Sequence, residues 1–293
     1  MSTLTSTKKL IVGHKRLYNS TRHLFRVYCN LIGPFHSLPD YLIIGAAKAG
    51  TTSLYEYMIR HQSVLPAHTK QLHYFDQYFN RGINWYKSML PSKAHKNKIK
   101  KNTKYSITGE ATPLYLYHPL APKRVFELVP NVKLIVLLRN PVDRAYSRHQ
   151  METNHNNEDL TFEEAIEKEP ERLEGEFEKM EKDGNYFSYH YNAHSYLTSG
   201  IYADQLERWF KYFPREQVLI LRSEDFYNDP KQSLSQVFEF LGIPNIKQET
   251  FEVYKKGKYS KMKPETRKKL VEFFKPHNER LYKLLGTNFR WDE

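Results

Sequence analysis

Two glycines, a lysine and two threonines occupy residues 45–52, between an apolar run and a helix-like segment. The apolar run at 41–44 reads Tyr-Leu-Ile-Ile and predicts a buried parallel strand. In the segment that follows, Leu54 and Met58 are four residues apart, which indicates one face of a helix. Glycines in a strand-to-helix turn let the backbone approach an anion, and the first amides of the helix point at it. The junction therefore predicts an α/β fold with an anion site.

The same alternation continues along the chain. Residues 132–138 and 218–221 are further apolar runs, and helix-like segments follow both. Strands that alternate with helices predict one parallel sheet with helices on both faces. We therefore expect a P-loop-like, three-layer α/β fold, with a central parallel sheet flanked by helices and a single domain over residues 39–293. Residues 93–104 carry six lysines and predict a solvated loop.

The glycine loop differs from the P-loop of nucleotide triphosphatases. That motif reads Gly-x-x-x-x-Gly-Lys-Ser/Thr, but here Thr51 stands at the lysine position and the lysine is Lys48. The second apolar run ends in Arg139-Asn140, with no acidic residue suited to holding magnesium. The pattern disfavours a magnesium–triphosphate site, so a metabolite kinase is kept only as a rival interpretation. We expect no metal.

A second anion site is predicted after the run at 132–138. Arg139 stands at its carboxyl end, where α/β sheets place their ligands. Ser147 follows near the start of the next predicted helix, and a guanidinium with a hydroxyl suits a phosphate. Taken without its neighbours, an arginine at this place also fits a salt-bridged surface group.

These segments resemble the PAPS-dependent sulfotransferases (PAPS is 3′-phosphoadenosine 5′-phosphosulfate). Residues 48–52 are similar to their 5′-phosphosulfate loop, and residues 139–147 are similar to their 3′-phosphate segment. The resemblance covers residues 40–293 and is closest to the heparan sulfate sulfotransferases. Five further segments carry it: Lys-Gln-Leu-His-Tyr-Phe at 70–75, Gly-Ile-Asn-Trp-Tyr at 82–86, Gly-Glu-Ala-Thr-Pro-Leu-Tyr at 109–115, Gly-Ile-Tyr at 200–202 and Gly-Thr-Asn-Phe-Arg-Trp at 286–291.

The resemblance implies a donor and roles for individual residues. It makes residues 39–293 a sulfotransferase domain with PAPS as the sulfuryl donor, and Glu110 the general base that removes the acceptor proton. Lys48 would stabilise charge on the leaving group, and Lys70 and His73 would assist at the sulfuryl oxygens or the acceptor. The implied cofactor-binding residues are Lys48, Ala49, Gly50, Thr51, Thr52, Ser53, Arg139, Ser147, Tyr202, Lys256, Gly257 and Lys258.

The acceptor implied by the resemblance is a carbohydrate, either a glycan or a glycolipid, that is sulfated on a hydroxyl or amino group. A protein tyrosine, a lipid headgroup or another small molecule stays open as an alternative. Ala111 replaces the lysine that follows the family's glutamate, and Gln71-Leu72 replaces its Glu-Pro. The two cysteines that bracket a C-terminal loop in the family are missing, and only residues 256–258 correspond to its basic turn. These departures leave the identity of the acceptor site undetermined, and they do not change the expected cofactor site.

The formal net charge of +12 favours anionic partners without choosing among them. A nucleic-acid-binding module is therefore a second rival interpretation. The lysines are scattered, however, and no motif that reads DNA or RNA is present, so we expect no nucleic-acid partner. Cys29 is the single cysteine, which excludes an internal disulfide. No pattern indicates an oligomeric state.

Residues 1–38 form a basic arm, in which six lysines and arginines precede the first acidic residue, Asp40. The arm has neither an apolar run long enough to span a bilayer nor the pattern of a signal peptide. We expect a flexible or loosely docked tail on a cytoplasmic enzyme. A peripheral contact of this arm with a membrane surface is the alternative.

Overall fold

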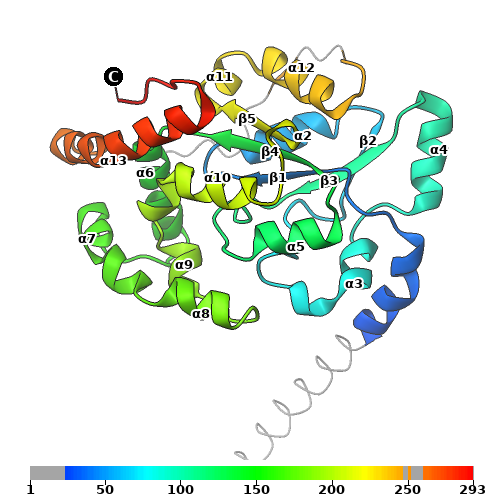
Figure 1. Cartoon of the computed structure of the whole chain (residues 1–293), viewed down its shortest axis with the longest axis horizontal. Helices are drawn as coiled ribbons and strands as arrows, with labels where there is room; N and C mark the ends of the chain where they lie inside the picture. Colours follow the sequence, from blue (N-terminus) through cyan, green and yellow to red (C-terminus); the bar gives the residue numbers. More distant parts are fainter. Residues whose placement is uncertain (1–23, 247–249, 252–259, 293) are drawn as a thin grey trace, which may run out of the picture.

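The computed structural model of the chain describes residues 24–246, 250–251 and 260–292 (Figure 1). Its centre is a five-stranded sheet in which each strand is parallel to its neighbours. The parallel α/β fold predicted from the alternating pattern is therefore confirmed. In order across the sheet, the strands are β2 (Val64–Pro66), β3 (Ile107–Ala111), β1 (Tyr41–Gly45), β4 (Lys133–Leu138) and β5 (Val218–Arg222).

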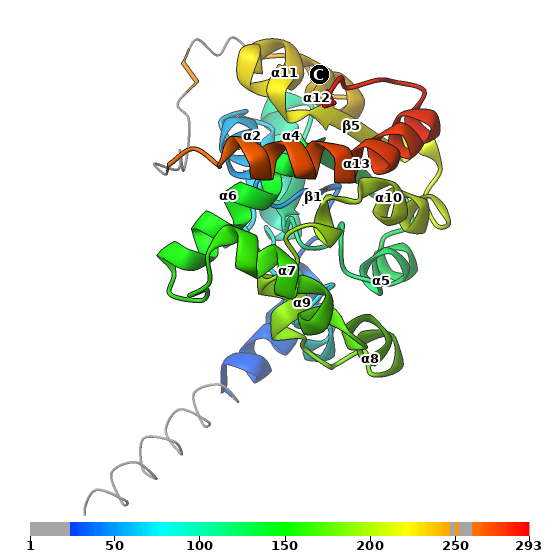
Figure 2. The ribbon, with the colours of Figure 1, turned by 90° about the vertical axis from the view of Figure 1, so that its left-hand side faces the viewer.

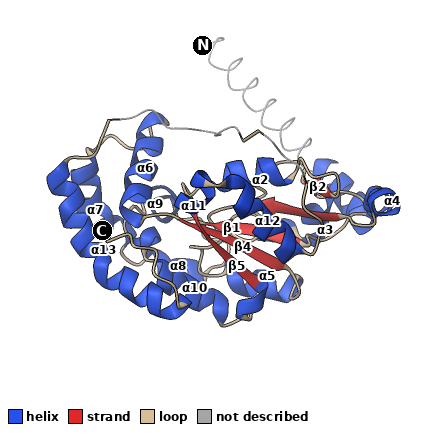
Figure 3. Ribbon diagram, turned by 90° about the horizontal axis from the view of Figure 1, so that it is seen from above, coloured by secondary structure: helices blue, strands red, loops and turns tan. Residues whose placement is uncertain are grey.

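Helices cover both faces of the sheet (Figures 1 and 3). On one face α2 (Thr51–Met58) lies over β1 and β3, and α12 (Pro230–Leu241) packs against it beside β5. On the other face lie α5 (Ala121–Leu128) and α10 (Tyr202–Phe210). The remaining helices are α3 (Ile83–Ser88), α4 (Lys93–Thr103), α6 (Pro141–Asn154), α7 (Phe162–Leu173), α8 (Glu176–Lys182), α9 (Tyr189–Ala193), α11 (Ser223–Asn228) and α13 (Pro264–Leu285), with 3₁₀ turns at Gly33–Phe35, Phe79–Arg81, Thr198–Gly200 and Arg215–Gln217.

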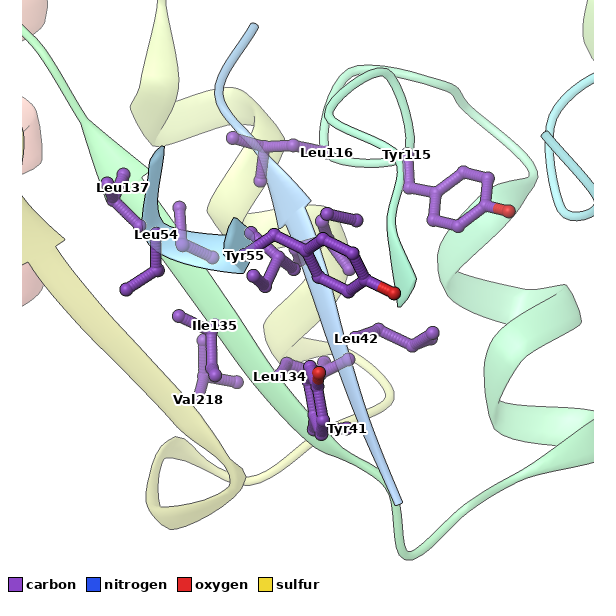
Figure 4. Close-up of a cluster of buried hydrophobic side chains, with 14 of the residues drawn as sticks. Tyr41, Leu42, Leu54, Tyr55, Tyr115, Leu116, Leu134, Ile135, Leu137 and Val218 are labelled. Atoms are coloured by element: carbon purple, nitrogen blue, oxygen red, sulfur yellow. The ribbon is translucent and has the colours of Figure 1, made fainter. Parts of the chain in front are cut away.

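The apolar runs that predicted the strands form the core. β1 is buried along its whole length, because it lies between β3 and β4 and is covered on both faces. Figure 4 shows side chains of β1, β4 and α2, among them Leu42, Ile135 and Leu54, gathered in one cluster. Burying a large aliphatic side chain contributes about 1.5–3 kcal/mol. This packing therefore fixes the two elements that flank the glycine loop.

The carboxyl ends of β1, β3 and β4 lie at the same edge of the sheet. Pairing of β1 with β4 continues past the strand, since the Ala46 amide donates to the Leu137 carbonyl at 2.7 Å. On the other side, the Leu116 amide donates to the Ile44 carbonyl at 2.8 Å. After β1, the chain forms β2 at one edge of the sheet and then β3, which lies between β2 and β1. It next passes to β4 on the other side of β1, so the direction in which strands are added reverses at β1. Ligands of α/β sheets bind at such a reversal, outside the carboxyl ends of the strands.

Two segments differ from what their sequence predicts. Residues 93–104 are not an open loop, because α4 occupies most of the segment and the Ser92 hydroxyl caps it by accepting the His95 amide at 3.2 Å. Lysine is a good helix former, and none of the α4 side chains is buried. Residues 24–32, expected to be part of a flexible or loosely docked tail, form a helix.

Candidate active site

The glycine loop between β1 and α2 needs glycine at two positions. A Cβ at Gly45 would lie 2.4 Å from the Leu116 Cβ, so the strand end can pass this segment only without a side chain. Gly50 has a φ of +99°, in the left-handed region that favours glycine. Lys48 also has a positive φ, +72°, although it carries a side chain. Such conformations are uncommon and cluster at functional sites, which agrees with a ligand-binding loop.

Residues of the loop and of the first turn of α2 form a partly exposed outer set and a buried inner set. Gly50 is the N-cap of α2, so no side-chain cap occupies this end of the helix among the described residues. The amide end of a helix carries a partial positive charge, which attracts an anion. Partly exposed beside it are Lys48, Gly50 and Thr52, whereas Ala49, Thr51 and Ser53 are buried. The outer set can contact a phosphosulfate directly, and the inner set supports the loop.

Two hydrogen bonds join this loop to neighbouring segments. At the end of β4, Arg139 Nη1 donates to the Lys48 carbonyl oxygen at 3.0 Å. After β2, Lys70 Nζ donates to the Thr52 hydroxyl. The Tyr202 hydroxyl donates to the Arg139 carbonyl at 2.9 Å, so it supports the arginine from α10. Residues from four distant parts of the sequence are thus brought together at the carboxyl edge of the sheet.

The segment expected to hold the 3′-phosphate continues from Arg139 into α6. The Asn140 side chain caps this helix by accepting the Val142 amide at 3.0 Å. Ser147 lies within the first two turns of α6 and is almost completely buried. The basic turn at residues 256–258, with Lys256, Gly257 and Lys258, lies outside the described residues.

Glu110, at the end of β3, is fully enclosed. Its carboxylate accepts hydrogen bonds from the Thr112 hydroxyl at 2.5 Å, the Tyr115 hydroxyl at 2.7 Å, the Tyr86 hydroxyl at 3.3 Å and the Leu72 amide at 3.3 Å. Burial raises the pKa of Glu110 to about 7, although the hydrogen bonds from Thr112, Tyr115 and Leu72 oppose the shift. Its exposed fraction is 0% in this structure. The bond from the Leu72 amide ties the carboxylate to the segment that carries Lys70 and His73.

Replacing Glu110 by Gln is expected to change how the stability of the chain depends on pH. The pKa of Glu110 is about 7 in the fold against an ordinary value of 4.5, so the folded state holds this proton more tightly than the unfolded state. The contribution of Glu110 to the free energy of unfolding should therefore be highest below about pH 4.5 and fall as the pH rises to about 7, by up to about 1.4 kcal/mol per pH unit. Glu110→Gln should lose that slope in urea unfolding. An equal slope in both proteins would contradict the assignment.

His73 lies on the same segment and has the geometry of an oriented base. Its Nδ1 lies 2.8 Å from Asp76 Oδ2, and the Asp76 side chain is completely buried. Its Nε2 lies on the more exposed side, 3.3 Å from Gln71 Oε1, and the His73 side chain is 19% exposed. Burial lowers the pKa of His73, but the hydrogen bond and the charge of Asp76 outweigh burial, so the pKa is raised. A carboxylate behind one ring nitrogen fixes the imidazole and leaves the other nitrogen to exchange a proton.

A narrow pocket opens beside the glycine loop. Arg144 is almost fully buried there, and its Nε has no hydrogen-bond partner among the described residues. Arg148, one turn further along α6, pairs with Glu152 at 2.9 Å. The sequence pattern for the 3′-phosphate segment contained Arg144 but did not single it out, although two arginines four residues apart share one helix face. Residues lining the pocket include Ala46, Ala47, Arg144, Arg148, Ser195 and Ser199.

Comparisons with known proteins give a matching family model and several similar chains. A family model described as "Sulfotransferase domain" matches residues 38–283. Bifunctional heparan sulfate N-deacetylase/N-sulfotransferase 3 of Homo sapiens is 31% identical, over 85% of this chain and 30% of its own length. Heparan sulfate glucosamine 3-O-sulfotransferase 3B1 of Homo sapiens is 29% identical, over 87% of this chain and 65% of its own length. The chain thus spans less than two thirds of both heparan sulfate relatives.

Two further matches cover more of the protein compared. Membrane-associated sulfotransferase kil1 of Dictyostelium discoideum is 27% identical, over 88% of this chain and 68% of its own length. Among solved structures, a sulfotransferase from Alicyclobacillus acidocaldarius has a TM-score of 0.65 and 28% identity, over 88% of this chain and 100% of that chain. The fold and the family resemblance seen in the motifs are therefore supported independently.

Proposed function

Because this chain belongs to the sulfotransferase domain family and is an enzyme that transfers sulfate, we propose that it takes the sulfuryl group from PAPS and passes it to a hydroxyl or amino group of a carbohydrate. The observation that carries the choice of donor is the 3.0 Å hydrogen bond from Arg139 to the Lys48 carbonyl. This bond joins the glycine loop to a second cationic group, Arg139, at the end of the neighbouring strand β4. One adenosine with phosphates at its 5′ and 3′ positions needs such a pair of sites.

The donor would be held by the outer set of loop residues and by the start of α6. Lys48, Gly50 and Thr52 with the amide end of α2 suit the 5′-phosphosulfate. Arg139 suits the 3′-phosphate, which is the group that distinguishes PAPS from adenylyl sulfate, and the almost completely buried Ser147 would support α6 beside it. The buried members Ala49, Thr51 and Ser53 would act through the backbone.

In the reaction, the acceptor oxygen or nitrogen forms a bond to sulfur while the bond from sulfur to the bridging oxygen of the 5′-phosphate breaks. The negative charge that develops on this oxygen leaves with the nucleotide product, PAP, and Lys48 is placed to stabilise it. Lys70, bonded to the Thr52 hydroxyl, would stabilise the sulfuryl oxygens. Catalysis of this kind is mostly positioning and electrostatics.

The acceptor proton would go to His73 Nε2 rather than to Glu110. The reason is access: His73 is partly exposed and is oriented by Asp76, whereas Glu110 is enclosed by four hydrogen-bond donors. Glu110 is then a positioning residue that holds Leu72, and through it His73, in place. Gln71, where the family has a glutamate, lies beside Nε2 and is neutral.

The acceptor would be a carbohydrate that carries an acidic group. Two relatives are named for heparan sulfate, a polyanionic glycan, and the pocket beside the loop places Arg144 and Arg148 where such a group can bind. The unpaired Arg144 Nε supports an anionic occupant, because a buried donor without a partner is costly. O- and N-sulfation both agree with this site.

Sulfate transfer from sulfur-labelled PAPS tests this assignment directly. We expect labelled product with a desulfated acidic glycan and none with a tyrosine peptide. Arg148→Gln should raise KM for the acidic glycan at least about tenfold, because a charge-assisted hydrogen bond is lost, and leave KM for a neutral oligosaccharide unchanged. Arg267→Gln removes an exposed arginine paired with Asp143 and controls for the loss of one positive charge. Labelled tyrosine peptide without labelled glycan would replace the carbohydrate with a protein acceptor.

The rival kinase interpretation makes a separate prediction. A P-loop kinase requires ATP and magnesium, so a chelator would stop it, whereas sulfate transfer from PAPS should proceed at the same rate with a chelator present.

For location, the Dictyostelium relative is named as membrane-associated, and a membrane-associated location is proposed for this chain as well. The cytoplasmic side expected from the sequence stays a prediction that cell fractionation can test.

A further inference from the structure

The helix at residues 24–32 carries an apolar stripe that the fold leaves uncovered. Leu24, Val27, Tyr28 and Leu31 recur at the i, i+3, i+4 and i+7 spacing of one helix face. All four are exposed, Leu24 to 67% and Leu31 to 68%. Phe35, just beyond the helix, is exposed to 70%. Scattered exposed apolar side chains are ordinary, but a contiguous set on one helix marks an interaction surface.

The stripe points away from the domain because the other side of the helix is anchored. Cys29 is completely buried, and a Cβ at Gly33 would lie 2.4 Å from the Asn84 carbonyl, so this segment packs closely on α3. His36 Nδ1 lies 2.6 Å from the Leu90 carbonyl, and Lys93 Nζ donates to the Pro34 carbonyl at 2.9 Å. Figures 1 and 2 show the helix projecting from the body of the domain. The apolar stripe is therefore held outward by the fold.

The charged residues of the N-terminal sequence that contains this helix have one sign. Residues 1–39 contain no aspartate and no glutamate. Arg26 lies on the helix itself, on the side opposite the stripe, where Asn30 also lies. The basic residues of this part of the chain are Lys8, Lys9, Lys15, Arg16, Arg22 and Arg26. An apolar face in a stretch of sequence whose charged residues are all basic suits a surface that is apolar inside and negative outside.

We propose that the helix at 24–32 lies in the interface of an anionic lipid membrane, with the stripe of Leu24, Val27, Tyr28 and Leu31 inserted among the acyl chains. Within the described residues no helix is long and apolar enough to cross a membrane, and the stripe covers one face only. Helices with one apolar face and basic flanks lie in the plane of the interface. A second copy of the chain fits less well, because a two-fold contact through this face would bring two unbalanced basic segments together.

Vesicle sedimentation with the full chain tests the proposal. Wild type should sediment with vesicles of mixed phosphatidylcholine and phosphatidylserine and much less with phosphatidylcholine alone, and added salt should weaken the binding. The double variant Leu24→Gln, Leu31→Gln should bind the mixed vesicles at least about tenfold more weakly, since two large apolar side chains no longer insert. Both leucines are exposed, so the thermal unfolding midpoint of the variant should match that of wild type.

A matched control removes two exposed apolar side chains elsewhere. Phe187→Gln, Phe273→Gln changes residues that are 51% and 41% exposed, and should bind the vesicles like wild type. Failure of wild type to sediment with anionic vesicles, or equal binding by the leucine variant, would overturn the proposal. So would a wild-type dimer that the leucine variant dissociates without any vesicle binding, because the stripe would then belong to a contact between copies.

Discussion

Replacing His73 by Asn should lower the turnover of PAPS about 10²–10⁴-fold, the usual contribution of a positioned general base, and leave the affinity for PAP unchanged. The imidazole is a partly exposed titratable group, and the buried carboxylate of Asp76 orients it through a 2.8 Å contact. The asparagine amide can still donate a hydrogen bond to Asp76 in place of Nδ1, but it cannot take up a proton. Steady-state kinetics and calorimetric titration with PAP separate the two effects.

His68→Asn is the control for this variant, because His68 is an exposed histidine five residues earlier on the same segment. It should turn over PAPS at the wild-type rate. Glu110→Gln should lower turnover less than His73→Asn, since Glu110 acts through the backbone of Leu72. Wild-type turnover by His73→Asn, or a larger loss in Glu110→Gln, would return the base to Glu110.

The pH profile follows from the same assignment. A base must be unprotonated to act, and Asp76 raises the pKa of His73 above its ordinary value of 6.5. Turnover should therefore rise with pH through a limb that lies above 6.5. Asp76→Asn removes the cause of the rise, so the limb should move to lower pH, and the maximal rate should fall because the ring is less well oriented. A limb that stays in place in Asp76→Asn would contradict the pairing.

The glycine loop and the sheet could be predicted from the sequence because their signals are local. Residues 41–44 are an uninterrupted apolar run, and the glycines follow it directly, so strand, turn and helix are read from adjacent residues. Arg139 was placed correctly at the carboxyl end of β4 by the same reasoning. Because the strands of the sheet are parallel, the carboxyl ends of β1 and β4 lie at the same edge.

The environment of Glu110 could not be predicted, because long-range packing decides it. The groups that enclose its carboxylate include Leu72 and Tyr86, which are 38 and 24 residues away in the sequence. The partnership of His73 and Asp76 did have a local signal, an i, i+3 spacing, but only the buried position of Asp76 shows that the carboxylate faces the ring. The helix at 24–32 also had a local signal, the i, i+3, i+4, i+7 spacing of its apolar residues, but Arg26 and Asn30 interrupt the apolar run.

Arg139→Gln should lower the affinity for PAP at least about 30-fold and the affinity for adenosine 5′-phosphate less than about threefold. Truncating one partner of a close charge pair typically costs about 2 kcal/mol or more, and only PAP carries the 3′-phosphate that would form this pair. Glutamine retains a donor for the Lys48 carbonyl, so the loop itself should keep its conformation. Lys48→Ala, in contrast, should weaken both ligands, because both carry a 5′-phosphate.

Arg222→Gln is the matched control, since Arg222 ends the neighbouring strand β5 and pairs with Glu224 at 3.3 Å. It should bind PAP like wild type. Equal losses for both nucleotides in Arg139→Gln would mean that the arginine supports the loop and does not read the 3′-phosphate. Weak PAP binding in wild type, with tight binding of ATP and magnesium, would remove the PAPS assignment altogether. A loss confined to PAP would instead identify Arg139 as the residue that selects PAPS over adenylyl sulfate, because the 3′-phosphate is the one group by which the two donors differ.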